Sequence, residues 1–217
     1  MKRLFCLGLA ALLLLLSLPT VYAEEKKRVA LTFDDGPHPV NTEAILSLLN
    51  EYKITATFFV IGENIEYFPR VFEKLLSANV EIGNHTHTHP KLKGQGEGAL
   101  SEELLRCERT IVSRGGERPT LFRPPEGVRS DEVTGASQKA GYRTVYWTLD
   151  TLDWTGASAD AIERAILSRV KDKSIILCHD YIVGGGHTVE AMRRVIPSLL
   201  ARGYEFVTVS ELLGTAD

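Results

Sequence analysis

The sequence predicts a single-domain α/β protein, an irregular (β/α)7-type barrel whose parallel strands are surrounded by helices. Three observations support this prediction. Short runs rich in β-branched and aromatic residues alternate with longer amphipathic runs along residues 28–208, which is typical of chains built from strand–helix units. Residues 24–217 suit seven units better than eight, because a complete eight-fold barrel typically needs about 250 residues. The unusual polar residues follow the predicted strands, where barrels place their chemistry.

The individual elements are predicted in chain order from these runs. Asn41 directly precedes one helix and Ser101 begins another, and both residue types favour helix starts. Strands are predicted at 28–33, 55–60, 80–83, 120–123, 142–147, 174–179 and 204–208. Helices are predicted at 42–52, 69–78, 101–113, 131–140, 160–169 and 189–202.

Residues 1–23 are predicted to be a secretory signal peptide, and residues 24–217 the mature domain. Lys2 and Arg3 precede an apolar run at 4–18, and Val21-Tyr22-Ala23 places small residues at both positions that a signal peptidase reads;. The run is shorter than the roughly 20 residues of a membrane-spanning helix. We therefore expect cleavage rather than a retained anchor, and a secreted or extracytoplasmic protein with no stable membrane span.

Composition and charge exclude several classes of protein. The chain is 44% hydrophobic and 24% charged, with three cysteines and a net charge of −3. These values exclude collagen-like, disordered and disulfide-dense chains. The negative charge argues against a nucleic-acid partner, and we expect a monomer.

Acidic residues lie at the end of the first predicted strand. Asp34 and Asp35 precede Gly36 and Pro37. Successive side chains of a strand point in opposite directions, so one carboxylate could bind a cation while the other faces the group that the cation activates. For this segment alone, an acidic turn is the alternative.

Three of the six histidines lie at 85, 87 and 89, directly after the third predicted strand. A helical turn would direct His85 and His89 to one side, whereas an extended segment would align all three. A polar loop without metal is the alternative. Two imidazoles and one carboxylate form the open site of zinc hydrolases, but the same donors also describe an iron oxygenase.

Three further segments carry polar residues that packing alone does not require. Arg123 ends the fourth strand and is too basic to shuttle protons, but it can hold a carboxylate. Asp153 and Trp154 combine an acid with an aromatic side chain, and His179 ends the sixth strand.

Together these segments resemble one protein family. The motifs are TFDDGP at 32–37, H-T-x-x-H at 85–89, R-P-P-x-G at 123–127, D-x-x-D-W at 150–154 and L-x-H at 177–179. In this order they are similar to the NodB-type polysaccharide deacetylases, carbohydrate esterase family 4. The resemblance extends from about Val29 to Leu213, and five ordered motifs make it specific.

The resemblance implies roles for the site residues. Asp35, His85 and His89 would hold a divalent metal, usually Zn²⁺, with Co²⁺ or another transition ion as the alternative. Asp34 would be the general base, oriented and kept ionised by Arg123. His179 would be the general acid, tuned by Asp153. His87 falls at a variable position and is not expected to bind the metal.

Substrate contacts follow from the same resemblance: Pro125, Glu126, Trp154 and Leu177. Trp154 and Leu177 would form apolar walls. Position 126 is often aromatic in relatives, and we hypothesise that the Glu126 carboxylate faces the sugar groove and binds a hydroxyl or amine there.

The implied function is a metal-dependent hydrolase that removes N-acetyl groups from N-acetylglucosamine units of a polysaccharide and releases acetate. Peptidoglycan is the first candidate substrate and chitin oligomers are the second. The alternatives are an acetyl-xylan-type O-deacetylase of the same family and a non-catalytic glycan-binding relative. The presence of Asp34 and His179 disfavours the non-catalytic relative.

Overall fold

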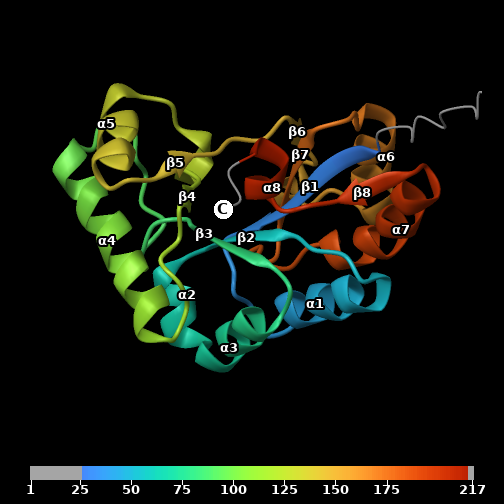
Figure 1. The fold of residues 1–217 in the computed structure, drawn as a ribbon, viewed down its shortest axis with the longest axis horizontal. Coiled ribbons are helices and arrows are strands. Elements are labelled where there is room, and N and C mark those ends of the chain that lie inside the picture. Colours follow the sequence, from blue (N-terminus) through green and yellow to red (C-terminus); the bar gives the residue numbers. More distant parts are fainter. Residues whose placement is uncertain (1–25, 215–217) are drawn as a thin grey trace, which may run out of the picture.

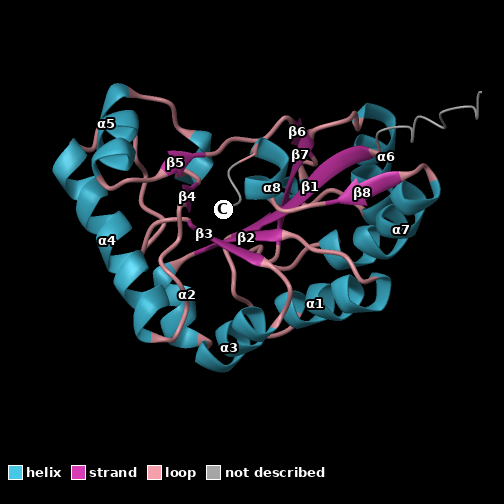
Figure 2. Ribbon diagram, viewed as in Figure 1, coloured by secondary structure: helices cyan, strands magenta, loops and turns pink. Residues whose placement is uncertain are grey.

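A computed structural model describes residues 26–214, and these form a curled parallel sheet surrounded by helices (Figures 1 and 2). The strand order is β5-β4-β3-β2-β1-β7-β6, and β8 pairs with β1. β5 and β6 lie at opposite ends of this order, so the sheet forms a half-barrel rather than a closed ring. The predicted fold class is confirmed, whereas the predicted signal peptide lies outside the described residues.

The elements follow one another as strand–helix units. They are β1 (Lys27–Asp34), α1 (Asn41–Tyr52), β2 (Thr57–Val60), α2 (Gly62–Tyr67), α3 (Pro69–Ser77), β3 (Glu81–Asn84), α4 (Glu97–Ser113), β4 (Leu121–Phe122), η1 (Pro125–Gly127), α5 (Asp131–Lys139), β5 (Arg143–Thr144), β6 (Leu149–Asp150), η2 (Asp153–Thr155), α6 (Ala159–Arg169), β7 (Ser174–His179), α7 (Thr188–Ala201), β8 (Tyr204–Phe206) and α8 (Val209–Leu213). The strand predicted at 142–147 is only two residues long, and the sequence does not predict α2, β6 or α8.

The alternation of side chains along β1 separates the core from the site. Val29, Leu31 and Phe33 belong to the large hydrophobic cluster beneath the helices, whereas Ala30 packs in a second cluster. Thr32 and Asp34 share the face of Ala30, because successive strand residues point to opposite faces. In the parallel register, Asp34 is paired with Phe59 of β2 and His179 of β7.

The C-terminal helix α8 contributes to this second cluster. Its Val209 and Leu212 pack there with Ala30 and Phe59, and Thr208 begins the helix with a reciprocal capping box to Glu211. Within residues 26–214, no helix has the length and apolar character needed to cross a membrane.

Candidate active site and metal centre

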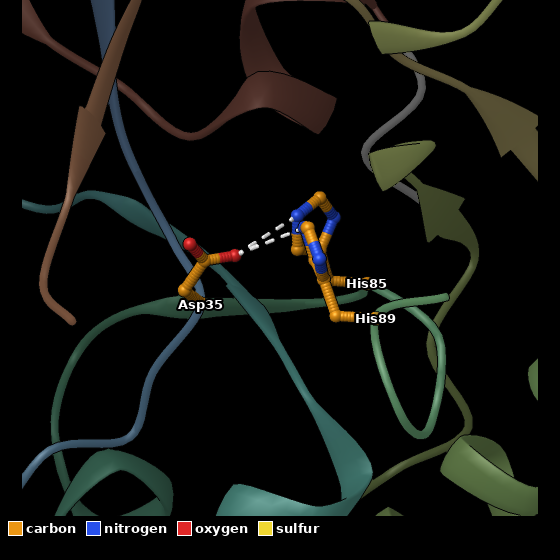
Figure 3. Close-up of side chains that lie close together, drawn as sticks. All are labelled: Asp35, His85 and His89. Atoms are coloured by element: carbon orange, nitrogen blue, oxygen red, sulfur yellow. Dashed lines mark ion pairs between the residues drawn. The ribbon is translucent and has the colours of Figure 1, made fainter. Parts of the chain in front are cut away.

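Three side chains from two loops converge beyond the end of β1 (Figure 3). Nε2 of His85 lies 3.2 Å from Asp35 Oδ1, and Nε2 of His89 lies 3.5 Å from the same oxygen. This oxygen is buried and has no hydrogen-bond partner among the described residues, and the three candidate ligand atoms lie within 4.8 Å of one another. His87 points elsewhere, with its Nε2 3.8 Å from Glu66 Oε1. Two imidazoles and a carboxylate oriented in this way fit a divalent metal such as zinc.

The contacts of two of these side chains suit metal binding. His85 Nδ1 lies 2.7 Å from the carbonyl oxygen of Arg123, and since a carbonyl only accepts, Nδ1 carries the hydrogen and Nε2 is left for a metal. Burial raises the pKa of Asp35, but the contact with His85 and the charges of His85, His179 and His89 outweigh burial and lower the pKa overall. Asp35 is therefore in the ionised form that metal ligation requires.

A carboxylate from α4 fixes the loop between the two histidines. Glu103 Oε2 accepts hydrogen bonds from the backbone N–H groups of His87 and Thr88, at 2.9 and 2.7 Å, and Oε1 accepts from Thr88 Oγ1 at 3.1 Å. Thr86 and His89 have φ angles of 71° and 52°, a conformation that costs free energy in residues other than glycine. The hydrogen bonds to Glu103 help to hold the loop in this conformation and so direct the His89 ring.

Asp34 forms a buried ion pair with Arg123. Nη1 of Arg123 donates to Asp34 Oδ1 and to Thr32 Oγ1, both at 2.7 Å, and the guanidinium lies 4.1 Å from the ring centroid of Phe59. Burial lowers the pKa of Arg123 against the opposing effect of the Asp34 charge. The pair fixes Asp34 Oδ1, while Oδ2 lies 3.9 Å from His85 Nε2, beside the candidate metal ligands.

His179 is held from behind by Asp153. Its Nδ1 lies 2.8 Å from Asp153 Oδ1, and Asp153 Oδ2 accepts from His179 N at 2.7 Å and from Thr188 Oγ1 at 2.8 Å. Burial lowers the pKa of His179, but the hydrogen bond and charge of Asp153, with the charges of Asp34 and Asp35, raise it to about 9. The imidazole is therefore protonated at neutral pH, and its Nε2–H is free of Asp153.

These groups border one cavity of about 530 Å³, although three of the predicted site residues do not line it. Arg123 and Asp153 lie behind the wall as partners of Asp34 and His179, and Pro125 is buried next to Pro124, which does line the cavity. The lining residues are Asp34, Asp35, His85, His89, Pro124, Glu126, Trp147, Asp150, Trp154, Leu177 and His179.

Trp147 and Asp150 line the cavity but are not identified as site residues from the sequence. Trp147 is the last residue of the predicted strand 142–147. Its position at a strand end is the one feature of the sequence that indicates a place near the site. Its ring packs closely on Gly127, where a Cβ atom would lie 2.5 Å from Trp147 Cη2 and where φ is +63°. The glycine of the R-P-P-x-G motif is therefore required for this wall. Glu126, directly before it, has a φ of 55° and an exposed side chain.

A larger, more open depression of about 870 Å³ lies elsewhere, at the amino ends of β3 and β4. It is lined by residues such as Leu75, Glu81, Arg118 and Glu211, and no histidine lines it. Its place in the fold separates it from the carboxyl ends of the strands, where the titratable cluster lies.

Comparison with known proteins gives consistent similarities. Residues 22–145 match the family described as polysaccharide deacetylase. The chain is 37% identical over 190 residues to a peptidoglycan-N-acetylglucosamine deacetylase of Bacillus cereus, covering 87% of this chain and 89% of the relative. It is 37% identical over 187 residues to a chitooligosaccharide deacetylase of Sinorhizobium fredii, covering 81% and 87%. The solved family 4 acetyl xylan esterase of Clostridium thermocellum, in complex with a cobalt ion, has a TM-score of 0.81 and 32% identity, covering 87% and 91%.

Proposed function

The chain belongs to the polysaccharide deacetylase family, and we propose that it is a metal-dependent hydrolase that removes N-acetyl groups from N-acetylglucosamine units. The observation that carries this proposal is the convergence of Asp34, the triad Asp35–His85–His89 and His179 on one cavity. Metal-assisted hydrolysis requires a base, an acid and metal donors around one reacting group, and this cavity brings such side chains together.

Asp35, His85 and His89 are the proposed ligands, with Zn²⁺ as the first candidate and Co²⁺ or another transition ion as the alternative. The mixed nitrogen and oxygen donor set and the fixed His85 tautomer support this assignment;. When bound, the ion would polarise the acetamide carbonyl and lower the pKa of a coordinated water.

The proposed proton transfers use two residues on either side of the triad. Asp34 accepts the proton of the water that attacks the acetamide carbon, and Arg123 keeps its carboxylate oriented through the 2.7 Å ion pair. His179 donates the Nε2 proton to the nitrogen as the C–N bond breaks. The products are acetate and a glucosamine unit with a free amine.

The walls of the cavity would hold the sugar and the acetyl methyl group. Trp154 and Leu177 supply apolar surface, and Glu126 lies where its carboxylate could bind a sugar hydroxyl or amine. Pro125 would act through the turn that places Glu126, because its own side chain is buried.

Peptidoglycan is the proposed substrate and chitin oligomers are the second candidate, since the relatives named above are peptidoglycan and chitooligosaccharide deacetylases. A second function, acetyl-xylan O-deacetylation, is favoured by the similarity to the acetyl xylan esterase. We further propose that residues 1–23 direct export of the chain, because these polymers lie outside the cytoplasm. We also propose that the protein acts as a monomer.

Acetate release from N-acetylglucosamine oligomers and muropeptides tests this function. We expect mass spectrometry to detect the replacement of acetyl groups by hydrogen, a chelator to abolish the reaction and added Zn²⁺ to restore it. Release that persists after complete removal of metal would contradict the mechanism, and release from acetylated xylan alone would favour the O-deacetylase.

The pH profile tests the role of His179 as the acid. Burial lowers the pKa of His179, but the contact with Asp153 and the charges of Asp34 and Asp35 raise it to about 9, so the donor form persists below that pH and is lost as the pH rises through it. We expect kcat/KM to fall on this alkaline side, since its profile reports the free enzyme. In Asp153→Asn the fall should begin at least one pH unit lower, because the charge that raised the pKa is gone.

Asp150→Asn provides the matched control, because it removes a carboxylate from the same cavity that makes no hydrogen bond to His179. In this variant kcat/KM should fall at the same alkaline pH as in the parent. If the alkaline fall of kcat/KM shifted equally in both variants, the total negative charge around the cavity, and not the contact with Asp153, would set the pKa of His179.

A further inference from the structure

Exposed apolar side chains concentrate at the carboxyl ends of the strands, the end that holds the cavity. Among the described residues, Leu105, Val112 and Leu200 lie on the long helices α4 and α7, where isolated exposed hydrophobics are common. The others all lie in segments that follow β1, β2, β6 or β7: Val40, Tyr67, Leu152, Trp154 and Val183. Trp154 lines the cavity, but Val40, Tyr67 and Val183 do not.

Four rings from these segments form a cluster, here called the ring ledge: His38, Tyr67, Phe68 and Tyr181. The centroids of His38 and Tyr181 lie 4.8 Å apart, and Phe68 lies 6.3 Å from His38 and 6.5 Å from Tyr181. Tyr67 extends the cluster at 6.4 Å from Phe68 and is 70% exposed. Three rings of the ledge, His38, Phe68 and Tyr181, are therefore half-buried, and the fourth ring, Tyr67, is strongly exposed.

The ring ledge also carries three polar groups that could bind a ligand: Nε2 of His38 and the hydroxyls of Tyr67 and Tyr181. His38 Nδ1 accepts hydrogen bonds from the backbone N–H groups of Val40 and Asn41, at 3.3 and 3.2 Å. Burial lowers the pKa of His38 and favours the neutral ring, so the hydrogen lies on Nε2 and can be donated. Within residues 26–214, the hydroxyls of Tyr67 and Tyr181 make no hydrogen bond.

The ring ledge is anchored to the same segments as the candidate active site. His38 follows Asp35 by three residues, and Tyr181 follows His179 by two. Helix α2, which ends at Tyr67, is tied to the site through Asn64, whose Nδ2 donates to the backbone oxygen of Asp35 at 2.6 Å. These connections place the ledge at the same end of the sheet as the cavity.

We propose that the ring ledge is a second glycan-binding site, which binds sugar units beyond the unit that reacts. Pyranose rings present C–H faces and hydroxyl edges, and the ledge offers apolar rings beside free N–H and O–H groups, the combination typical of sites for such ligands. The occupant is a glycan because the chain is a polysaccharide deacetylase, whose substrate continues beyond the reacting unit. The choice of N-acetylglucosamine polymers as probes rests on the proposed function.

The test compares long and short substrates in a Tyr67→Ser/Tyr181→Ser variant. We expect the ratio of kcat/KM for a long N-acetylglucosamine oligomer to kcat/KM for the disaccharide to fall about tenfold, as loss of ~1.4 kcal/mol of binding would produce. Leu105→Ser, an exposed apolar residue on α4, is the control and should keep the parent ratio. Tyr67→Ser alone should lower the ratio in the same direction, and its high exposure limits any effect on folding.

A binding measurement separates this proposal from the proposed function. Electrophoresis through gels that contain soluble chitin or soluble peptidoglycan measures glycan binding without catalysis. Slower migration of the parent and the control, but not of the double variant, would support the ledge even if no acetate were released, in which case only the proposed function would fail. Equal migration of parent and double variant, or no retardation of the parent, would overturn the ledge proposal.

Discussion

Replacing Asp34 with asparagine is expected to lower kcat/KM on N-acetylglucosamine oligomers by about 10²–10⁴-fold, the range that general acid–base catalysis contributes. The asparagine Oδ1 can still accept the hydrogen bond that Arg123 Nη1 makes at 2.7 Å, but its amide cannot take a proton from water. Zinc affinity should change little, because Asp34 is outside the proposed ligand set. Steady-state kinetics and zinc titration of one preparation measure both quantities.

Asp35→Asn is the matched comparison, because the two carboxylates are adjacent in the chain. Asp35 Oδ1 lies 3.2 Å from His85 Nε2 and 3.5 Å from His89 Nε2, so its loss should weaken zinc binding strongly, and excess zinc should recover part of the activity. Excess zinc should not rescue Asp34→Asn. Near-parent activity in Asp34→Asn with zinc bound would rule out Asp34 as the base.

The sequence predicts the interiors of long elements well because they contain enough residues to show a period, although α4 begins at Glu97, before the predicted start at Ser101. The predicted strand 174–179 coincides with β7, and the predicted helix 131–140 differs from α5 by one residue. β6 is two residues long, too short to show alternation. Leu149 is in a strand because it pairs with Ile176 of β7, a contact that the local sequence does not encode.

The same distinction applies to the site. Asp34, Asp35, His85 and His179 are predictable because they lie at or just beyond strand ends, where parallel sheets place their chemistry. Glu103 is not predictable, because Glu102 beside it has the same side chain in the same helix. In the structure Glu102 pairs with Arg109 at the surface, whereas Glu103 accepts two backbone N–H groups of the histidine loop. Only tertiary contacts distinguish the two residues.

Replacing Arg123 with methionine is expected to reduce the free energy of unfolding by about 3–5 kcal/mol, the cost of removing one partner from a buried ion pair. Arg123 is fully buried and Asp34 is 2% exposed, so the variant leaves a carboxylate in the interior without its 2.7 Å partner. Methionine retains most of the apolar contact with Phe59. Urea denaturation should be measured with a chelator present, because a bound ion would add its own stabilisation.

Two further variants test whether the loss of stability comes from the unpaired Asp34 carboxylate. Arg194 faces three carboxylates, but its side chain is 40% exposed, so Arg194→Met should cost much less, as solvent screens surface pairs. Asp34→Asn combined with Arg123→Met should be more stable than Arg123→Met alone, because the unpaired charge is gone. If Arg123→Met were no more destabilising than Arg194→Met, the buried pair would contribute no more to stability than an exposed one.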